Sequence, residues 1–170
     1  MLDPGMAFGT GSHPSTRLCL EWLYKNVQGG EAVLDYGCGS GILAIAAAKL
    51  GASRVLGIDL DDNALTAARD NAAANSVNIE LRHSCSSSGE TFDCVVANIL
   101  SGPLCELAPL LTAHLSAGKR KKPGRLALSG VLENQGDEVI AAYAPLIQLK
   151  VAALLDGWVL LEGPRQDMEP

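Results

Sequence analysis

Three closely spaced glycines carry the sharpest chemical signal in this sequence. They stand in the segment Asp35-Tyr36-Gly37-Cys38-Gly39-Ser40-Gly41, between a short apolar run and an Ala-rich stretch. Glycine tolerates positive φ angles and lets the backbone approach a ligand closely. The start of a helix presents free N–H groups and a positive dipole end to an anion. The segment therefore predicts an anion-binding turn between a buried strand and a helix.

The glycine spacing indicates which anion this turn would take. A dinucleotide site favours GxGxxG, whose last glycine lets the helix pack around a pyrophosphate, whereas this sequence has GxGxG preceded by an acid. A methionine carboxylate fits better, and Asp35 can face the amino group of the same ligand, directly or through water. Asp59 ends the next predicted strand, where a carboxylate can accept both hydroxyl protons of a ribose. Together these residues favour S-adenosylmethionine as cofactor over an ordinary tight turn.

A second constellation of small and polar residues lies near the N-terminus, in Phe8-Gly9-Thr10-Gly11-Ser12-His13-Pro14-Ser15-Thr16. Its glycines allow close backbone approach, and its hydroxyls can bond polar atoms of a ligand. His13 could accept a proton, but a lone histidine in a loop is more often exposed or a helix cap, so we give it no catalytic role. Ser12 or Ser15 is expected to cap a helix that runs to about residue 27 and covers the cofactor side.

Asn98 follows the apolar run at residues 92–97. Open α/β sheets bind their ligands at the carboxyl ends of the strands, which makes Asn98 the best candidate to contact the substrate. The alternative is an Asn that ends the strand by bonding its own backbone, and the sequence alone favours neither.

The elements that must position these residues alternate between strand and helix, as in βαβ units around a parallel sheet. Asp-Gly at 156–157 between two strand-like runs predicts a terminal β-hairpin. The region 84–91 is polar and rich in serine, which is typical of a surface loop. Strands are expected at 32–36, 54–58, 78–82, 92–97, 125–130, 147–155 and 158–162, and helices at 42–50, 63–75, 103–115 and 133–144.

Composition and charge limit the classes of protein. A chain of 170 residues fits one domain, with 48% hydrophobic residues and a net charge of −6. The acidic balance argues against strong, sequence-independent nucleic-acid binding. The basic run at 119–122, with Arg125, could contact RNA or an acidic partner, but such a run in a Pro/Gly loop is more often only solvated. The five cysteines are scattered without a close CxxC pair, so neither a metal site nor a disulfide framework is expected.

No apolar run is long enough to span a membrane, and the first residues lack the pattern of a secretory signal. We therefore expect a cytoplasmic protein that has no membrane partner. An organellar location would require a targeting segment upstream of residue 1.

Several segments together resemble the PrmA family, the methyltransferases of large-subunit ribosomal protein L-eleven. The match spans nearly the whole chain. The loop at residues 7–11 together with the strand end at residues 97–100 is a much narrower signature than the widely shared glycine motif. The segments are Pro4-Gly5-Met6-Ala7-Phe8-Gly9-Thr10-Gly11, the run from Asp35 to Ala46, Gly57-Ile58-Asp59, and Ala97-Asn98-Ile99-Leu100.

The resemblance implies a class I S-adenosylmethionine-dependent methyltransferase fold, Rossmann-like, with a seven-stranded and mainly parallel sheet that ends in an antiparallel hairpin. It implies that the family's activity, methylation of amino groups on a ribosomal protein, belongs to a catalytic domain at residues 1–170, in which residues 1–30 form a cofactor-covering loop and helix. The separate amino-terminal recognition domain of the family is absent from this sequence. The cofactor contacts that the resemblance implies are Thr16, Gly37, Asp59 and Asn98, with Phe8 and Thr10 lining the same pocket; the glycine turn adds Asp35 and Gly39.

In the mechanism that we expect, a neutral amine attacks the sulfonium methyl group in line, and oxygens at Asn98 and its neighbouring backbone aim the amine. Neither a covalent nucleophile nor a metal is required. The alternatives are a methyltransferase that acts on a small molecule or a nucleic acid, an NAD-dependent oxidoreductase, and an inactive module that binds the cofactor. The missing sixth-position glycine disfavours the oxidoreductase.

Overall fold

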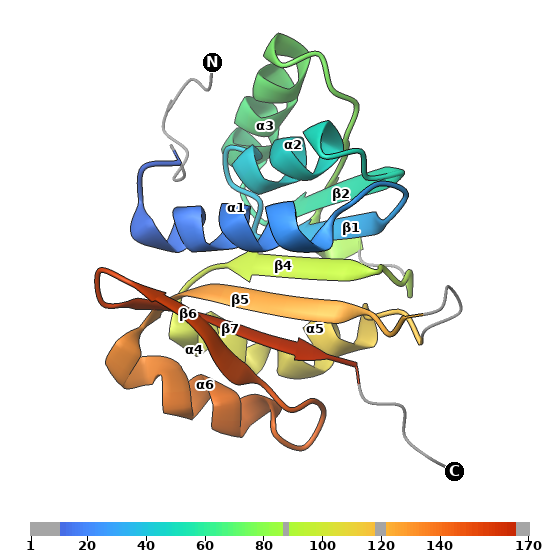
Figure 1. The fold of residues 1–170 in the computed structure, drawn as a ribbon. Coiled ribbons are helices and arrows are strands. Elements are labelled where there is room, and N and C mark those ends of the chain that lie inside the picture. Colours follow the sequence, from blue (N-terminus) through green and yellow to red (C-terminus); the bar gives the residue numbers. More distant parts are fainter. Residues whose placement is uncertain (1–10, 87–88, 118–121, 166–170) are drawn as a thin grey trace.

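The computed structural model describes residues 11–86, 89–117 and 122–165. Among these residues, seven strands form one sheet in the order β3-β2-β1-β4-β5-β7-β6 (Figure 1). The elements are α1 (Pro14–Asn26), β1 (Ala32–Tyr36), α2 (Ile42–Lys49), β2 (Arg54–Asp59), α3 (Asp62–Ala74), β3 (Glu80–His83), η1 (Ser84–Ser86), β4 (Cys94–Asn98), α4 (Ser101–Glu106), α5 (Ala108–Ala113), β5 (Arg125–Leu132), η2 (Glu133–Gln135), α6 (Gly136–Tyr143), β6 (Lys150–Leu155) and β7 (Trp158–Pro164).

The sheet is parallel from β3 to β5, and β7 runs antiparallel to both of its neighbours. This arrangement confirms the seven-stranded, mainly parallel sheet with a terminal antiparallel hairpin. At the hairpin tip, Asp156 and Gly157 have φ angles of 50° and 79°. Positive φ at both central residues is what a two-residue type I′ turn requires, and an Asp-Gly pair adopts it readily.

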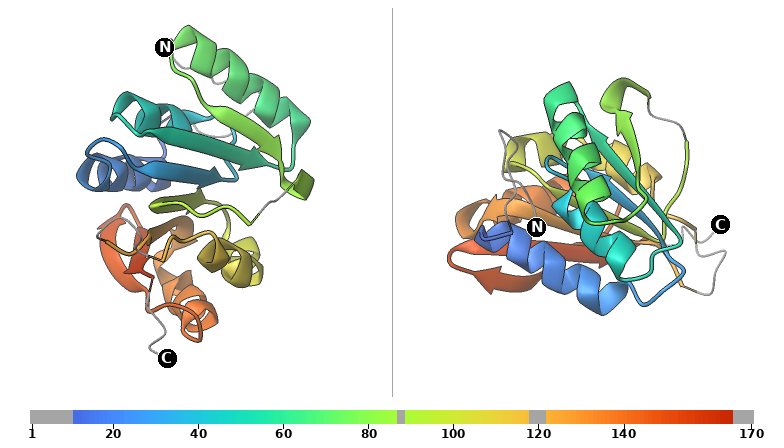
Figure 2. Two further views of the ribbon diagram at one scale, coloured as in Figure 1. Left: turned by 90° about the vertical axis from the view of Figure 1, so that its right-hand side faces the viewer. Right: turned by 90° about the horizontal axis from the view of Figure 1, so that it is seen from above.

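Two apolar layers cover the two faces of the sheet, because successive strand residues point to opposite sides. Val33 packs with residues of α1 and α2, whereas the next residue, Leu34, packs with residues of α4, α5 and α6. Val96 and Val95 of β4 repeat this division. Figure 2 shows the sheet twisting between the helices on its two sides. The strands β1 and β4 are therefore covered on both faces, which explains their nearly continuous apolar sequence.

The boundaries differ from the sequence-based expectation at several elements. The segment 103–115, predicted as one helix, forms α4 and α5, which meet at Leu107. Pro109 lies in the first turn of α5, where its missing N–H costs no intrahelical hydrogen bond, so the chain starts a new helix there. The helix predicted at 133–144 begins as the 3-10 turn η2 before α6. The strands β3 and β4 each begin two residues later than expected.

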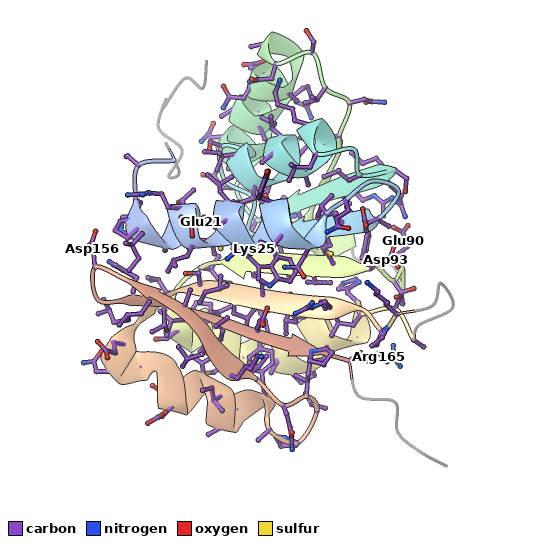
Figure 3. The ribbon with its side chains drawn as sticks, in the orientation of Figure 1. Glu21, Lys25, Glu90, Asp93, Asp156 and Arg165 are labelled. Atoms are coloured by element: carbon purple, nitrogen blue, oxygen red, sulfur yellow. The ribbon has the colours of Figure 1, made fainter. Side chains whose placement is uncertain are left out.

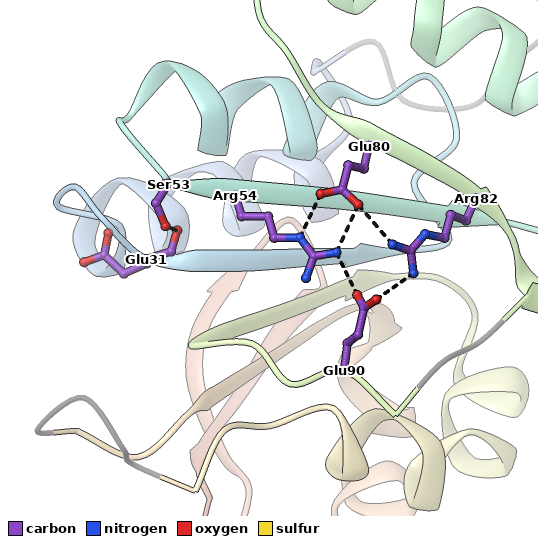
Figure 4. A network of polar contacts seen from close by, with 6 residues as sticks. All are labelled: Glu31, Ser53, Arg54, Glu80, Arg82 and Glu90. Carbon is purple, nitrogen blue, oxygen red and sulfur yellow. Dashed lines mark hydrogen bonds and ion pairs between the residues drawn. The ribbon is translucent and has the colours of Figure 1, made fainter.

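An ion-pair network joins β2 and β3 to the segment that leads into β4 (Figure 4). Arg54 lies 2.8 Å from both Glu80 and Glu90, and Arg82 lies 3.0 Å from the same two carboxylates. These side chains are about one-third to one-half exposed, so each pair alone contributes little stability. Because both arginines pair with both glutamates, the four side chains together hold Glu90 against β2 and β3.

Candidate functional site

The carboxyl ends of β1, β2 and β4 meet at one edge of the sheet, and they bring together the polar residues singled out in the sequence. Tyr36 pairs with Ile58 on one side and with Ala97 on the other, so the residues that follow these three positions are neighbours. In Figure 3 the hairpin tip at Asp156 marks this side, and Glu90 and Asp93 lie at the opposite side of the sheet. This edge is the place where open α/β folds bind ligands.

The glycine turn is pinned to β2 by backbone hydrogen bonds. The N–H groups of Gly37 and Cys38 both donate to the carbonyl oxygen of Ile58, at 2.7 and 2.9 Å, and the N–H of Gly41 donates to Cys38 O at 2.8 Å. Gly37 has a φ of +74°, and a Cβ atom there would lie 2.6 Å from Cγ2 of Ile99. Only glycine satisfies both constraints. The turn then opens α2, whose N-cap residue, Gly41, has no side chain to cap the first turn.

Asp35 is buried one residue before the end of β1, with 1% of its surface exposed. Its Oδ2 accepts the N–H of Ala44 at 3.1 Å, whereas Oδ1 is buried and has no hydrogen-bond partner in the described part of the chain. Burial raises the pKa of this carboxyl from 3.8 to about 7; the Ala44 N–H opposes the shift, and the charge of Asp59 adds to it. An orphaned carboxylate oxygen beside a ligand-binding turn fits an incoming ammonium group.

Asp59, the last residue of β2, has an orientation fixed by the backbone around it. Its Oδ2 accepts the N–H of Gly39 at 2.8 Å, and its Oδ1 accepts the N–H of Asp61 at 3.0 Å. A carboxylate offers about four acceptor positions, so these two bonds leave capacity for ligand hydroxyls. The amide of Gly39, a residue expected to contact the cofactor, donates to Asp59 in this structure. Gly39 therefore positions the carboxylate in this structure.

Asn98 ends β4 and contacts α1 rather than its own backbone. Its Nδ2 donates to Oγ1 of Thr16 at 3.2 Å, and Thr16 is buried in the first turn of α1. This bond fixes the plane of the Asn98 amide. The two residues, which the sequence suggested separately, thus form one polar pair at the carboxyl edge.

The cap of α1 is His13, so the expectation of Ser12 or Ser15 was wrong. Its Nδ1 accepts the N–H of Ser15 at 3.3 Å and lies 2.7 Å from Oγ of the same serine. An imidazole nitrogen can replace a serine hydroxyl here because it also offers an acceptor lone pair to the free amides of the first turn. Of the two non-catalytic roles considered for His13, exposed loop residue or helix cap, the structure shows the cap, and the ring also packs edge-on against Trp158, with 4.7 Å between centroids.

From the sequence we did not predict the hydrogen bonds that hold α1 against the sheet, which we call the α1 clamp. Trp22 Nε1 donates to Oε2 of Glu162 at 2.7 Å, and Arg125 pairs with the same oxygen at 3.1 Å. Through these bonds β5 and β7 hold the helix that carries Thr16. A contact between residues 140 positions apart leaves no local pattern by which it could be found.

Phe8 and Thr10, expected to line the pocket, lie outside the described residues, as does most of the basic run at 119–122. The described residues contain no group of three or more potential metal ligands, and no helix among them could cross a membrane. All five cysteines lie in the described part of the chain, and none of them forms a disulfide there.

Comparison with known proteins places this geometry in a family. The profile of the family described as "Ribosomal protein L11 methyltransferase (PrmA)" matches residues 1–166. The ribosomal protein L11 methyltransferase of Cupriavidus pinatubonensis is 58% identical over 164 residues, which cover 96% of this chain and 54% of that protein. The corresponding protein of Thiobacillus denitrificans is 53% identical over 165 residues, covering 97% of this chain and 54% of that protein. The chain therefore spans about half the length of these relatives.

Solved structures agree with this relationship. The ribosomal protein L11 methylase of Lactobacillus delbrueckii subsp. bulgaricus superimposes with a TM-score of 0.87 at 36% identity, covering 98% of this chain and 84% of that one. The 16S rRNA N2 G1207 methyltransferase of T. thermophilus, solved with AdoMet and guanosine, has a TM-score of 0.72 at 20% identity and covers 94% of this chain and 45% of that one; it shares the fold. The protein thus has a class I methyltransferase fold, and it belongs to the ribosomal protein L11 methyltransferase (PrmA) family.

Proposed function

We propose that this chain is the catalytic domain of an S-adenosylmethionine-dependent methyltransferase that transfers methyl groups to amino groups of a ribosomal protein of the L11 type. The observation that carries the proposal is the buried Oδ1 of Asp35, which lacks a partner among the described residues and lies beside a glycine turn that Asp59 braces. In this proposal the domain comprises residues 1–170, and residues 1–30 cover the cofactor.

The cofactor-binding roles follow from the chemistry of each group. Asp35 Oδ1 would accept the ammonium group, and the start of α2, whose N-cap Gly41 has no capping side chain, would face the carboxylate with its positive dipole end. Asp59, already oriented by two backbone amides, would bind the ribose hydroxyls. Phe8, Thr10 and Thr16 complete the proposed set. When bound, S-adenosylmethionine supplies an electrophilic methyl group on a sulfonium.

The acceptor site would be organised by Asn98. A lysine amine has an ordinary pKa near 10.4, so populating its neutral form at pH 7 costs roughly 4 to 5 kcal/mol. Amide and backbone oxygens at Asn98 can accept the N–H groups of a neutral amine and aim its lone pair. Because Thr16 holds Nδ2 of Asn98, the amide is orientated before the acceptor binds. The proposed catalytic role is therefore positioning, without a strong base.

A protein substrate is favoured over a nucleic acid by two observations. The names of the relatives specify ribosomal protein L11, and the chain has a net charge of −6. Neutralising many phosphates requires a surplus of basic side chains, which this composition does not provide. A ribosomal substrate also agrees with a cytoplasmic location, which we propose with it.

The experiment is titration calorimetry with S-adenosylmethionine and S-adenosylhomocysteine on the parent and on Asp59→Ala, with the exposed Asp62→Ala as the matched control. Hydrogen bonds to a charged group contribute about 1.5 to 3 kcal/mol each, so Asp59→Ala should weaken both ligands at least tenfold, roughly one unit of 1.4 kcal/mol. Asp62→Ala should bind as the parent does. Equal affinities for all three proteins would exclude the proposed cofactor site.

The acceptor is tested by following labelled methyl groups from S-adenosylmethionine into purified ribosomal protein L11 and into ribosomal RNA. Incorporation into the protein alone is expected. Labelling of RNA alone would replace the protein substrate by the nucleic-acid alternative. Tight cofactor binding with no transfer to any acceptor would favour an inactive binding module.

A further inference from the structure

A thiol and an imidazole meet just beyond the end of β3, next to the proposed ribose site. His83 is the last residue of β3 and pairs in register with Asp59, the last residue of β2. Cys85 follows in the 3-10 turn η1 and is exposed. Sγ of Cys85 lies 3.0 Å from Nδ1 of His83. Neither residue has a part in the function proposed above.

The hydrogen bonds around His83 fix which ring nitrogen carries the proton. Nε2 lies 2.8 Å from the carbonyl oxygen of Leu60, which can only accept, so Nε2 must donate. Nδ1 accepts the backbone N–H of Cys85 at 3.3 Å, so it presents a lone pair. With Nε2 as donor, the ring turns the lone pair of Nδ1 toward the Cys85 thiol, while a third group, Leu60 O, orients the ring. Nucleophile, base and orienting group in sequence are the arrangement that activates a thiol.

The other four cysteines provide an internal comparison. Cys19, Cys38 and Cys94 are buried, and burial raises the pKa of all three thiols, that of Cys94 to about 12. The pKa of the half-buried Cys105 is also raised, first by burial and then by nearby glutamates. Raised pKa values and burial make these thiols poor nucleophiles. Cys85 alone among the five combines exposure with a facing base.

We propose that Cys85 is a modification site at which a small disulfide forms a mixed disulfide with this protein, assisted by His83. The thiol proton passes to Nδ1 of His83, and the Cys85 sulfur attacks one sulfur of the disulfide. The disulfide bond breaks, and the departing thiolate takes the proton from the imidazolium. One S–S bond forms and one breaks, so the protein thiol is oxidised and half of the disulfide is reduced to a free thiol.

The position of Cys85 gives this modification a consequence. His83 bonds the carbonyl of Leu60, the residue after Asp59, and the Leu60 side chain is 76% exposed. A group attached to Cys85 therefore extends from the same edge on which Asp59 would bind a ribose. If the proposed function holds, a mixed disulfide at Cys85 and a bound nucleotide exclude each other. Cofactor binding then depends on the redox state of Cys85.

The test measures the release of thionitrobenzoate when the native protein reacts with excess 5,5′-dithiobis(2-nitrobenzoic acid), an aromatic disulfide. We expect one thiol to react in a fast phase. Cys85→Ser should abolish this phase, and the matched Cys105→Ser should retain it. His83→Gln can keep the donor to Leu60 O but lacks the base, so the fast rate should fall roughly three- to tenfold. An ordinary thiol is only partly ionised at pH 7, and complete ionisation would raise its rate by about 30-fold. The expected contribution of His83 lies below this limit.

Two results would overturn the modification site: a fast phase that survives Cys85→Ser, or a rate that His83→Gln leaves unchanged. The link to the cofactor is tested separately by adding saturating S-adenosylhomocysteine, which should slow the fast phase at least fivefold. Unchanged reactivity, in a protein that calorimetry shows to bind S-adenosylhomocysteine, would refute the mutual exclusion. A protein that binds no S-adenosylhomocysteine would contradict the proposed function but leave the Cys85 reactivity to be judged by the variants.

Discussion

Because the carboxyl of Asp35 is buried, we predict that the stability of the protein depends on pH in an unusual way. Its pKa is raised from 3.8 to about 7 by burial, so the folded protein binds this proton more tightly than the unfolded chain does. Stability contributed by this group is fully present below about pH 4 and is lost as the pH rises through about 7. Replacement by Asn removes the titration, and the amide oxygen can still accept the N–H of Ala44, now 3.1 Å from Oδ2. The variant should therefore gain stability over the parent as the pH rises.

The size of this gain follows from the two pKa values. Ionisation of Asp35 costs the folded state about 2 kcal/mol at pH 5 and about 4 kcal/mol at pH 8, relative to a group that stays neutral. The difference in the free energy of unfolding between Asp35→Asn and the parent should therefore grow by about 2 to 3 kcal/mol over this range. Other titrating groups are common to both proteins and cancel.

The assay is urea unfolding of both proteins at pH 5 and pH 8, followed by circular dichroism. Asp62→Asn, an exposed aspartate in the first turn of α3, is the control, and its difference from the parent should stay nearly constant with pH. Asp35→Asn should also lose at least tenfold in affinity for S-adenosylhomocysteine, because a neutral amide no longer attracts the ammonium group. A stability difference that grows by less than about 0.5 kcal/mol, or that reverses, would refute the conclusion that burial raises the pKa of Asp35 to about 7.

Two further substitutions test the turn and the acceptor site. Gly37→Ala should destabilise the protein by about 1 to 2 kcal/mol through its positive φ, plus the contact of the new Cβ with Ile99, in chemical denaturation. Adding Ile99→Ala should not restore the backbone component, and a fully stable Gly37→Ala would show that the turn accepts a side chain. Asn98→Ala should reduce methyl transfer at saturating cofactor by roughly tenfold or more, whereas Asn75→Ala, at the far end of α3, should transfer normally. Unchanged transfer would remove Asn98 from the proposed acceptor site.

The fold was predictable where local patterns determine it. Apolar runs of strand length, with glycine or Asp-Gly at their ends, gave β1, β2 and the terminal hairpin close to their observed positions. The pattern failed where tertiary contacts set the boundary. Apolar periodicity continues through 103–115, but the backbone breaks at Leu107 because Pro109 can begin a helix and not continue one. Similarly, Phe92 looks like strand, yet it forms only an isolated bridge with Leu115.

The candidate site divides in the same way. Asp35, the glycine turn and Asp59 were predictable because strand, turn and helix follow each other directly in the chain. The bond from Asn98 to Thr16 joins residues 82 positions apart, and the α1 clamp of Trp22 on Glu162 spans 140. No local rule predicts which distant partner a polar side chain meets. The Cys85–His83 pair is local, but its importance depends on Leu60, which another strand brings close.

The charges at the carboxyl edge discriminate between the cofactors that the sequence left open. The charge of Asp59 raises the pKa of the neighbouring Asp35, and no basic side chain is among the causes that set the pKa of Asp35. After burial, the charges of these two aspartates also raise the pKa of Cys38. A pyrophosphate would add two negative charges to this region, which like-charge repulsion opposes. S-adenosylmethionine carries two positive groups, an ammonium and a sulfonium, and only one carboxylate. Its net positive charge relieves the repulsion between Asp35 and Asp59 in the folded protein. The acidic pair of Asp35 and Asp59 therefore supports the sulfonium cofactor independently of the glycine spacing.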